Sequence, residues 1–524
     1  YLETRHTPSL SEPMQVTKES QRLENTRATI LFYLSAFVAF LGVPLFFYTT
    51  LIHRAHLPTE EVQQRVTDFG KNAVFHIPIY VDPGLASPEL IAQTQRVIDA
   101  SLAQENLAQA WGLDLRAGNA ENIDKLKDYV VTLKSVAAEL DLLLMYRLSP
   151  ASKEICVYTS NGHSIEGMAN YISMVLLQTV FKDELAAVKK ILNDEHTTDV
   201  VFPYAPAYNV VFNLFVEDGR PVTWPIEQAV EFIQPVFSAL KNYANFKISS
   251  QIHYYSKLQS EPSLNDDGTA RVIPQTDLAT FINYGEWNLN THDIAPSINF
   301  LVFFPSGNYE NVPLLVENSR TNSFLIPQWG GVHIFNTKET PKDDKGSKLV
   351  YRISESELEL VFDIFASQLF ELLGVPKVPL SPFLRVDAFH RVATLKNMKR
   401  ALSNLQALLK ISSSLHGISI PESTRANVIS SLENYDKAVE LLQNNDFEAS
   451  VAFAAKSVTK SDEAFFEKEM VQQAYFPSEH KLAVFLPLLG PICSIVFFGL
   501  IKYLRSRKAS RKESETSEPG KKEI

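Results

Sequence analysis

The chain has 524 residues, 45% of them apolar, and a formal net charge of −11. An apolar fraction of this size can fill a core, which excludes a chain that is disordered along most of its length. The acidic balance, with no basic stripe in the central region, argues against nucleic acid as a partner, and two cysteines exclude a scaffold built on disulfides.

The first predicted element is an uncharged apolar run, Ala28–Ile52. Its 25 residues exceed both the ~20 needed to cross a bilayer and the ~7–15 of the apolar core of a cleaved signal. We therefore predict a retained transmembrane helix behind an N-terminal tail, residues 1–27. Arg22 and Arg27 precede this helix closely enough to contact lipid phosphates, so membrane lipid is a predicted partner. The alternative is that both arginines only help to orient the helix.

Between residues 53 and 350, strand and helix signals alternate, which predicts an α/β domain with a mixed sheet and flanking helices. The predicted strands are Ala73–Val81, Asp141–Leu148, Glu154–Tyr158, Asn209–Val216, Phe246–Lys257, Ile298–Phe304 and Ser323–Phe335. The predicted helices are Pro88–Ala110, with Ser87 as its N-cap, Glu166–Leu192 and Ile226–Tyr243.

From residue 351 to residue 481 the pattern is helical throughout, which predicts a helical module leading to the membrane. Its predicted helices cover residues 355–373, 384–415, 422–443 and 446–475. A second uncharged run follows, Leu482–Ile501, and apolar residues cover every side of it, so we predict a second transmembrane helix. Proline and glycine interrupt both runs, a composition that suits packing against other membrane helices.

Basic residues around the second run predict the topology. Only Lys468 and Lys481 precede it closely, whereas eight lysines and arginines follow it in residues 502–524. This bias places the basic tail in the cytosol. Two crossings then place the N-terminus in the cytosol as well and residues 53–481 on the other side. The charges around the first run are balanced and do not discriminate.

The chain ends in Lys521-Lys522-Glu523-Ile524, which resembles the dilysine retrieval signal of endoplasmic-reticulum (ER) membrane proteins. We therefore predict a two-pass ER membrane protein whose main domain is luminal. The alternative is an ordinary basic tail. Two observations lend this prediction no support: Cys156 has no luminal partner, because Cys493 lies in the second run, and the central region contains no Asn-x-Ser/Thr sequon.

A search for catalytic motifs finds no nucleophile elbow, zinc-protease helix or phosphate-binding loop. His196 with Asp199, and His292 beside Asp293, are candidate metal or acid–base pairs, but solvated turn residues are the commoner interpretation. Cys156 and His163 are a candidate nucleophile and base, although only their closeness in sequence pairs them. No catalytic residue, metal site or cofactor is predicted.

The segment Pro327-Gln328-Trp329-Gly330-Gly331 stands out within a predicted strand. Adjacent glycines permit a positive φ or a close approach of the backbone, which predicts a bulge or tight bend beside a packed indole. A contact site for a partner is the alternative.

Several segments together resemble the PIG-S family, a subunit of the glycosylphosphatidylinositol (GPI) transamidase. The first is Leu41-Gly42-Val43-Pro44-Leu45 with Thr49-Thr50 and Arg54-Ala55-His56-Leu57-Pro58. The second is the run from Pro296 to Pro305, and the third runs from Phe324 through Pro327-Gln328-Trp329-Gly330-Gly331 to Val332. The resemblance extends from the first predicted span to the second.

This resemblance implies a non-catalytic structural subunit of an ER complex that replaces the C-terminal signal peptide of proproteins with a GPI anchor. The implied partners are a caspase-like cysteine protease, PIG-K, which carries the nucleophile, together with PIG-T, PIG-U and an aminopeptidase-like subunit. Two alternatives stay open from the residues alone: an ER-membrane enzyme of the glycosyltransferase kind with an unrecognised site, and a two-pass membrane tether.

Overall fold

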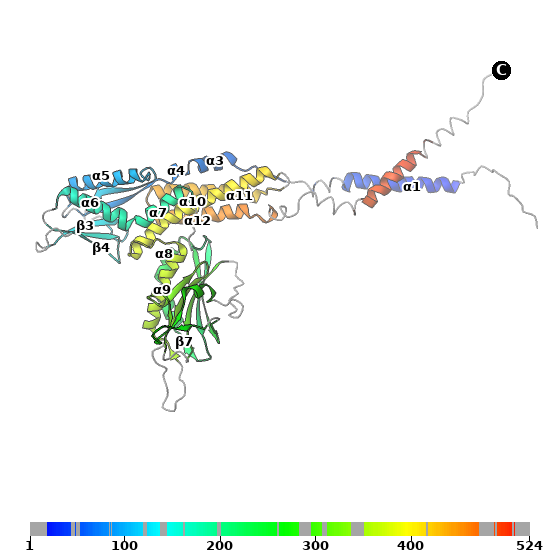
Figure 1. The fold of residues 1–524 in the computed structure, drawn as a ribbon. Coiled ribbons are helices and arrows are strands. Elements are labelled where there is room, and N and C mark those ends of the chain that lie inside the picture. Colours follow the sequence, from blue (N-terminus) through cyan, green and yellow to red (C-terminus); the bar gives the residue numbers. More distant parts are fainter. Residues whose placement is uncertain are drawn as a thin grey trace, which may run out of the picture. The chain divides into compact units, whose positions relative to one another are not determined.

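The computed structural model describes residues 18–42, 53–82, 86–118, 123–136, 144–160, 163–195, 201–258, 261–281, 295–306, 312–336, 351–415, 418–470 and 490–505, with the single positions 44, 48, 84, 487 and 508. Figure 1 shows its helices and strands. The chain forms two compact units. The large unit comprises residues 57–410 and 425–465, and the small unit comprises residues 1–56, 411–424 and 466–524.

The first sheet of the large unit has five strands in the order β2-β1-β3-β5-β4. Strand β1 pairs in parallel with β2 and β3, β3 pairs in parallel with β5, and β4 pairs with β5 in antiparallel fashion. The sheet is therefore mixed. The strand bounds are β1 Phe75–Val81, β2 Trp111–Ala117, β3 Tyr129–Ser135, β4 Met145–Leu148 and β5 Glu154–Thr159.

Helices cover one face of this sheet. Helix α5 (Pro88–Gln104) connects β1 to β2, and the side chain of its N-cap residue Ser87 accepts a hydrogen bond from Leu90 N. After β5, the chain forms α6 (Ile165–Val175), a π-helical turn η2 (Leu176–Val180) and α7 (Lys182–Leu192). Alternate residues of β1 are buried because they share one hydrophobic core with these helices.

The second sheet also has five strands, in the order β13-β14-β11-β6-β8. Only the β13–β14 pair is antiparallel among its strand pairs. The bounds are β6 Ala207–Val216, β8 Asn245–Tyr254, β11 Ser297–Phe304, β13 Ser323–Ile326 and β14 Gly330–Ile334. Strand β6, which lies between β11 and β8, is buried along almost its whole length, and the Phe212 ring stacks on Phe362 of α9 (Glu355–Leu373) with ring centroids 4.7 Å apart.

The remaining elements around the second sheet are one long helix and several short elements. Helix α8 (Ile226–Leu240) packs beside α9. Strands β9 (Ser263–Leu264), β10 (Arg271–Ile273) and β12 (Leu314–Val316) form a small three-stranded sheet, and β7 (Val222–Thr223) pairs with β15 (Tyr351–Arg352). A 3-10 helix, η3, spans Gln275–Thr280.

The two five-stranded sheets have the same topology. In each, the first strand in sequence lies between the second and the third, and the last two strands form the antiparallel pair at the far edge. In each, a helix joins the first strand to the second, and it packs against the helix that follows the fifth strand: α5 on α6, and α8 on α9. The large unit thus contains one α/β arrangement twice.

Three long helices complete the part of the chain between residues 382 and 465: α10 (Pro382–Ser414), α11 (Glu422–Gln443) and α12 (Phe447–Phe465). Different sides of α10 enter different cores. Val392 and Leu395 belong to the core of the first sheet, whereas Phe389 and Ala393 belong to the core of the second. Further along, Met398 and Leu402 pack with residues of α11 and α12. Before the first sheet lie α3 (Thr59–Thr67) and α4 (Phe69–Asn72).

The small unit contains α1 (Lys18–Phe37) and a π-helical turn, η1 (Val38–Gly42). Within the described residues, one helix is long and apolar enough to cross a membrane, Asn25–Gly42. It overlaps the predicted first span, Ala28–Ile52, most of whose last ten residues lie outside the described residues. Residues 490–505 are helical, but most of the N-terminal half of the predicted second span lies outside the described residues. Arg54 donates hydrogen bonds to the Leu415 carbonyl at 3.0 Å and to Ser412.

The predicted mixed α/β domain and the C-terminal helices are confirmed, with corrections. There are two mixed sheets instead of one. The single strand predicted over Ser323–Phe335 is a pair, β13 and β14. The helix predicted over Glu166–Leu192 is interrupted at Phe181, where the ring packs against Trp111 and Tyr129 with centroids 5.4 and 5.3 Å away.

Two strands of the five-stranded sheets were not predicted, β2 and β3, nor were the short strands β7, β9, β10, β12 and β15. The helix predicted over Pro88–Ala110 ends at Gln104, followed closely by Asn106 at φ 59° and then by β2. Residues 141–143 of the strand predicted over Asp141–Leu148 and residues 471–475 of the last predicted helix lie outside the described residues. The predicted division at residues 350/351 stays a prediction.

Candidate functional site

Arg22 and Arg27 both lie on α1 and are exposed. They are five positions apart, so their side chains leave the helix roughly 140° from each other. Within the described residues neither is in an ion pair. Two separate lipid contacts therefore fit this geometry better than one headgroup held by both arginines.

Several predicted site residues lie outside the described residues: Lys521 and Lys522, the pair His196 and Asp199, and the pair His292 and Asp293. In the described part of the chain, no group of three or more His, Cys, Asp or Glu side chains could hold a metal ion.

Cys156 is buried in β5, and it is a free cysteine. Among the described residues, no hydrogen bond joins it to His163, whose Nε2 atom is buried without a partner. The pairing that their closeness in sequence suggests is therefore not formed in this structure.

Within the segment Pro327 to Gly331, residues 327–329 form the tight connection between β13 and β14, and Gly330 and Gly331 begin β14. Gln328 has a φ of 56° and Gly330 a φ of 154°, both in the region that non-glycine residues rarely adopt. A Cβ on Gly330 would overlap the backbone of Asn299 in β11. Trp329 is buried, and its carbonyl accepts a hydrogen bond from Asn299 N at 2.9 Å. The segment thus lets the start of β14 lie directly against β11.

A buried ionic network connects α10 to the first sheet. Arg391 is fully buried on α10, and its guanidinium donates to both oxygens of Glu184 on α7, at 2.7 and 2.6 Å. It also donates to Asp387 and to the hydroxyl of Tyr129 on β3. Lys153 donates to the other Asp387 oxygen at 2.8 Å. Two cations and two carboxylates balance, as buried charges require.

The charges in this network determine its electrostatics. Burial alone would raise the pKa of Asp387, but Arg391 and Lys153 outweigh it and hold that pKa well below its ordinary value. Burial also raises the pKa of Tyr129 well above its ordinary value, so the hydroxyl stays protonated and donates to Asp387 at 2.7 Å. Each charged group here is paired, so the arrangement fixes helix α10 and leaves no group poised for proton transfer.

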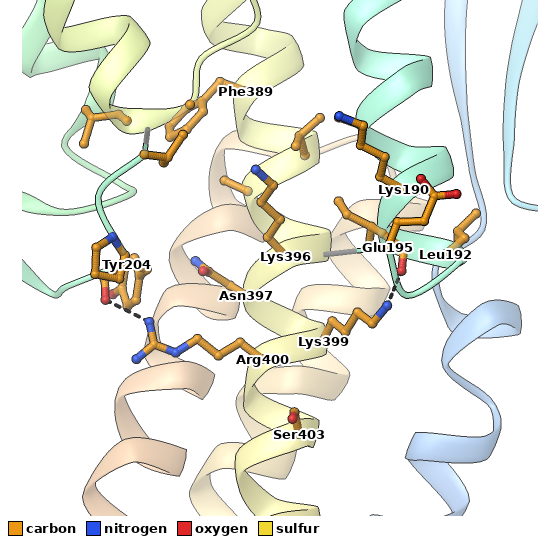
Figure 2. A pocket seen from close by; sticks show the side chains of 18 of the residues that line it. Lys190, Leu192, Glu195, Tyr204, Phe389, Lys396, Asn397, Lys399, Arg400 and Ser403 are labelled. Atoms are coloured by element: carbon orange, nitrogen blue, oxygen red, sulfur yellow. Dashed lines mark hydrogen bonds between the residues drawn. The ribbon is translucent and has the colours of Figure 1, made fainter. Parts of the chain in front are cut away.

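A pocket of about 1350 Å³ lies along another side of α10, and we call it the α10 pocket (Figure 2). Residues of α7, α10 and the segments 201–204 and 371–377 line it. Apolar side chains form much of its wall, among them Leu192, Val201, Phe389 and Val392. Figure 2 shows Lys190 and Lys396 extending into its open space.

Asn397 is the unusual polar group of the α10 pocket. Its side chain is 3% exposed, and its Nδ2 atom has no hydrogen-bond partner within the described residues. Figure 2 shows its amide projecting from α10 between Lys396 and Arg400. An unpaired buried amide group costs free energy unless water or a ligand bonds to it.

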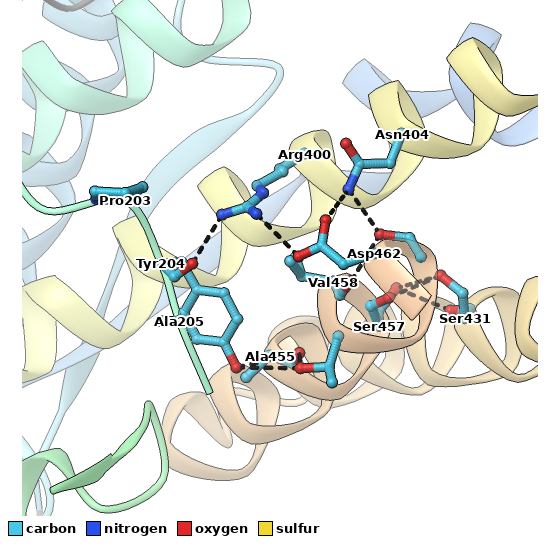
Figure 3. Close-up of polar contacts among 12 residues, drawn as sticks. Pro203, Tyr204, Ala205, Arg400, Asn404, Ser431, Ala455, Ser457, Val458 and Asp462 are labelled. Atoms are coloured by element: carbon cyan, nitrogen blue, oxygen red, sulfur yellow. Dashed lines mark hydrogen bonds and ion pairs between the residues drawn. The ribbon is translucent and has the colours of Figure 1, made fainter. Parts of the chain in front are cut away.

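On the C-terminal side of Asn397, polar contacts connect α10 to α12 and to the segment at residues 203–205 (Figure 3). Arg400 donates to the Tyr204 carbonyl and to Asp462, both at 2.9 Å. Asn404 donates to Asp462 at 2.6 Å and to Ser461. These contacts hold this part of the wall of the α10 pocket in place.

Comparison with known protein families identifies the family to which this chain belongs. Residues 33–510 match the family described as Phosphatidylinositol-glycan biosynthesis class S protein, or PIG-S. The chain belongs to the PIG-S family. The resemblance detected in the sequence is thereby confirmed over nearly the whole chain.

Similar curated proteins carry names from one complex. The chain is 28% identical to the GPI transamidase component GPI17 of Saccharomyces cerevisiae, over 94% of each chain. It is 24% identical to the GPI-anchor transamidase component PIGS of Rattus norvegicus, over 93% of this chain and 96% of the relative. Against the human protein of the same name, identity is 27% over 59% of each.

In this PIG-S chain, sequence reasoning missed Arg391, Asp387 and Asn397. All three lie in the helix predicted over residues 384–415, where charged and amide side chains are normally taken as the solvated face. One signal was available: Arg391 lies between apolar neighbours, in Phe389-His390-Arg391-Val392, instead of within a polar stretch. Its partners Glu184 and Tyr129 are too far away in sequence to be found without the fold.

Proposed function

We propose that this chain is a non-catalytic structural subunit of the ER GPI transamidase, the complex that attaches GPI anchors to proteins. The observation that carries this proposal is the PIG-S match over residues 33–510, together with a relative named as a GPI transamidase component that matches 94% of the chain. The inferred partners are the other subunits of that complex: a caspase-like protease, PIG-K, with PIG-T, PIG-U and an aminopeptidase-like subunit.

A non-catalytic role is supported by what the described residues do. The buried Cys156 has no hydrogen bond to His163, and the fully paired ionic network around Arg391 fixes a helix. Groups poised for catalysis instead pair a nucleophile with a base. The nucleophile then belongs to the cysteine-protease subunit.

The proposed organisation has residues 1–27 in the cytosol, a first span at 28–52, a luminal α/β domain at 53–350 and a luminal helical module at 351–481. A second span at 482–501 and a basic cytosolic tail at 502–524 complete it, with Lys521 and Lys522 as an ER-retrieval motif. Support comes from the exposed apolar helix Asn25–Gly42 and from the basic residues after residue 501.

Affinity purification of the full chain in mild detergent tests the functional proposal. We expect the cysteine-protease subunit to co-purify and the preparation to form GPI-linked product. Recovery of the chain without that subunit would refute the assignment.

The lipid contact of Arg22 and Arg27 has a separate test. In the purified complex, the double substitution Arg22→Ala and Arg27→Ala should lower the amount of bound anionic phospholipid. The matched control is Thr26→Ala, an exposed position on the same helix. Equal lipid content in the double variant and the parent would refute the contact.

A further inference from the structure

We propose that the α10 pocket binds an extended peptide segment of another transamidase subunit, with the Asn397 amide as its polar anchor. This inference rests on the proposed function, because it requires the chain to act within a complex. Three features of the pocket support it: its size, its unpaired amide group and its charge.

The size of the α10 pocket suits a peptide better than a small molecule. Its volume of about 1350 Å³ exceeds the roughly 300–1,000 Å³ typical of small-molecule sites. Leu192, Val201 and Pro203, which are half-buried or exposed, supply apolar wall for side chains. A stretch of several residues fills such a space and buries these walls.

Asn397 provides the hydrogen-bonding group for such a segment. A primary amide has two donor hydrogens and an acceptor oxygen, which match the carbonyl and N–H of one peptide group. The side chain is only 3% exposed, and its Nδ2 lacks a partner within the described residues. A peptide group seated on it would provide the missing hydrogen bond. A purely apolar ligand would leave the cost of burying this amide in place.

The charges of the pocket favour an acidic segment. Four carboxylates line it against five cations, an excess of one positive charge. Asp183 accepts from two backbone amides, Glu371 pairs with Lys377 at 2.7 Å, and Asp194 pairs with Lys399 at 2.5 Å. The fourth carboxylate, Glu195, is exposed and accepts a hydrogen bond from Asn193 at 3.4 Å. Lys190 lines the pocket, is exposed, and has no ion pair within the described residues. A carboxylate on the incoming segment would therefore meet a cation that the chain itself does not neutralise.

Site-specific photocrosslinking in the purified complex tests the proposal. p-Benzoylphenylalanine is placed at Ser403, which lines the α10 pocket, and in a matched control at Ala407, which is exposed one turn further along α10 and outside the pocket. Both are combined with Asn397→Leu, which keeps the side chain's size but removes the amide. Mass spectrometry identifies the crosslinked peptide.

We expect crosslinks at position 403 to an acidic segment of another subunit, and about a tenfold loss of this product in Asn397→Leu. Crosslinks at position 407 should not respond to Asn397→Leu. The thermal unfolding midpoint of Asn397→Leu should equal or exceed that of the parent, because the variant loses a buried unpaired amide; this separates lost binding from lost folding.

The proposal is overturned if the other subunits co-purify but position 403 crosslinks only within this chain or to nothing, as expected of a water-filled pocket. It is equally overturned if the crosslink is unchanged by Asn397→Leu. If no other subunit co-purifies with the parent chain, the proposed function fails, and this proposal fails with it.

Discussion

Gly331 is a residue whose small size the second sheet requires. A Cβ at this position would overlap Oε1 of Gln368 on α9, whose Nε2 donates to the Phe324 carbonyl at 3.1 Å. Because Gln368 is buried between the helix and the sheet, it has little room to move.

We predict that Gly331→Ala lowers the free energy of unfolding by about 1–3 kcal/mol. Urea unfolding of the full chain in detergent, followed by tryptophan fluorescence, measures this change. Gly70→Ala is the matched control, since nothing lies within 4 Å of a Cβ there, and it should be neutral or slightly stabilising. Equal stability of the two variants would contradict the proposed close packing.

His333 on β14 gives a prediction about pH. Burial lowers the pKa of His333 from 6.5 to about 4, so the unfolded chain binds a proton between these values that the folded chain does not. This histidine therefore costs no stability above pH 6.5, and destabilises the fold progressively as the pH falls toward 4. The loss amounts to roughly 2–4 kcal/mol.

The measurement is the difference in unfolding free energy between the parent chain and His333→Gln at about pH 7.5 and at about pH 5, on either side of the ordinary histidine pKa. The glutamine variant should gain stability relative to the parent at the lower pH, because it has no proton to take up on unfolding. A difference that does not depend on pH would show that His333 titrates normally in the folded chain.

At the scale of elements, the ionic network around Arg391 holds α10 to the first sheet. Arg391→Met keeps the aliphatic part of the side chain but removes the guanidinium, which leaves Glu184 buried without its cation. We predict a loss of about 3–5 kcal/mol of unfolding free energy. Lys437→Met is the control, since it removes an exposed ion pair with Glu440, and its effect should stay below about 1 kcal/mol. Similar losses in both variants would refute the role of the network.

The bounds of a helix or strand were predictable where residues next to its ends determine them. The predicted bounds of α9 and α11 match the structure because their ends carry strong signals, such as Gly374, which ends α9 at φ 78°. Strands β2 and β3 were missed because no strand pattern was assigned to Trp111–Ala117 or to Tyr129–Ser135. Their place in the sheet depends on pairing with β1, a contact distant in sequence.

The β13–β14 turn could be predicted only in part from local sequence signals. The glycines and the tryptophan predicted an irregular backbone at Pro327 to Gly331, and the structure places a turn there. The reason for Gly330 could not be predicted, because the atoms that exclude its Cβ belong to Asn299, on a strand well before it in the chain. The α10 pocket could not be predicted from the sequence for the same reason, since its walls come from separate segments of the chain.

At the scale of the whole molecule, the large unit repeats one sheet topology, although the sequence shows no internal repeat. Different amino-acid sequences form the same strand order in the two sheets, because a buried strand requires only apolar, well-packed side chains. Helix α10 contributes to the cores of both sheets, so this helix joins the two halves.

The luminal position of the large unit is a further prediction. Asp267→Asn completes an Asn-Gly-Thr sequon with Gly268 and Thr269 at an exposed turn, and we expect the variant to gain an endoglycosidase-sensitive glycan in cells. Asp267→Gln is the matched control and should gain none. An unglycosylated Asp267→Asn variant would contradict a luminal domain.

The central claim is that this chain is a non-catalytic subunit of the GPI transamidase. It is tested most directly in cells that lack their own copy of this subunit and are supplied with the parent chain or a variant. The measurement is the surface level of a GPI-anchored reporter. The account predicts that the reporter is lost without the chain and is restored equally by the parent chain and by the double variant Cys156→Ser with His163→Ala. A reporter that persists without the chain, or one that the double variant fails to restore while the protein is present at normal levels, would contradict it.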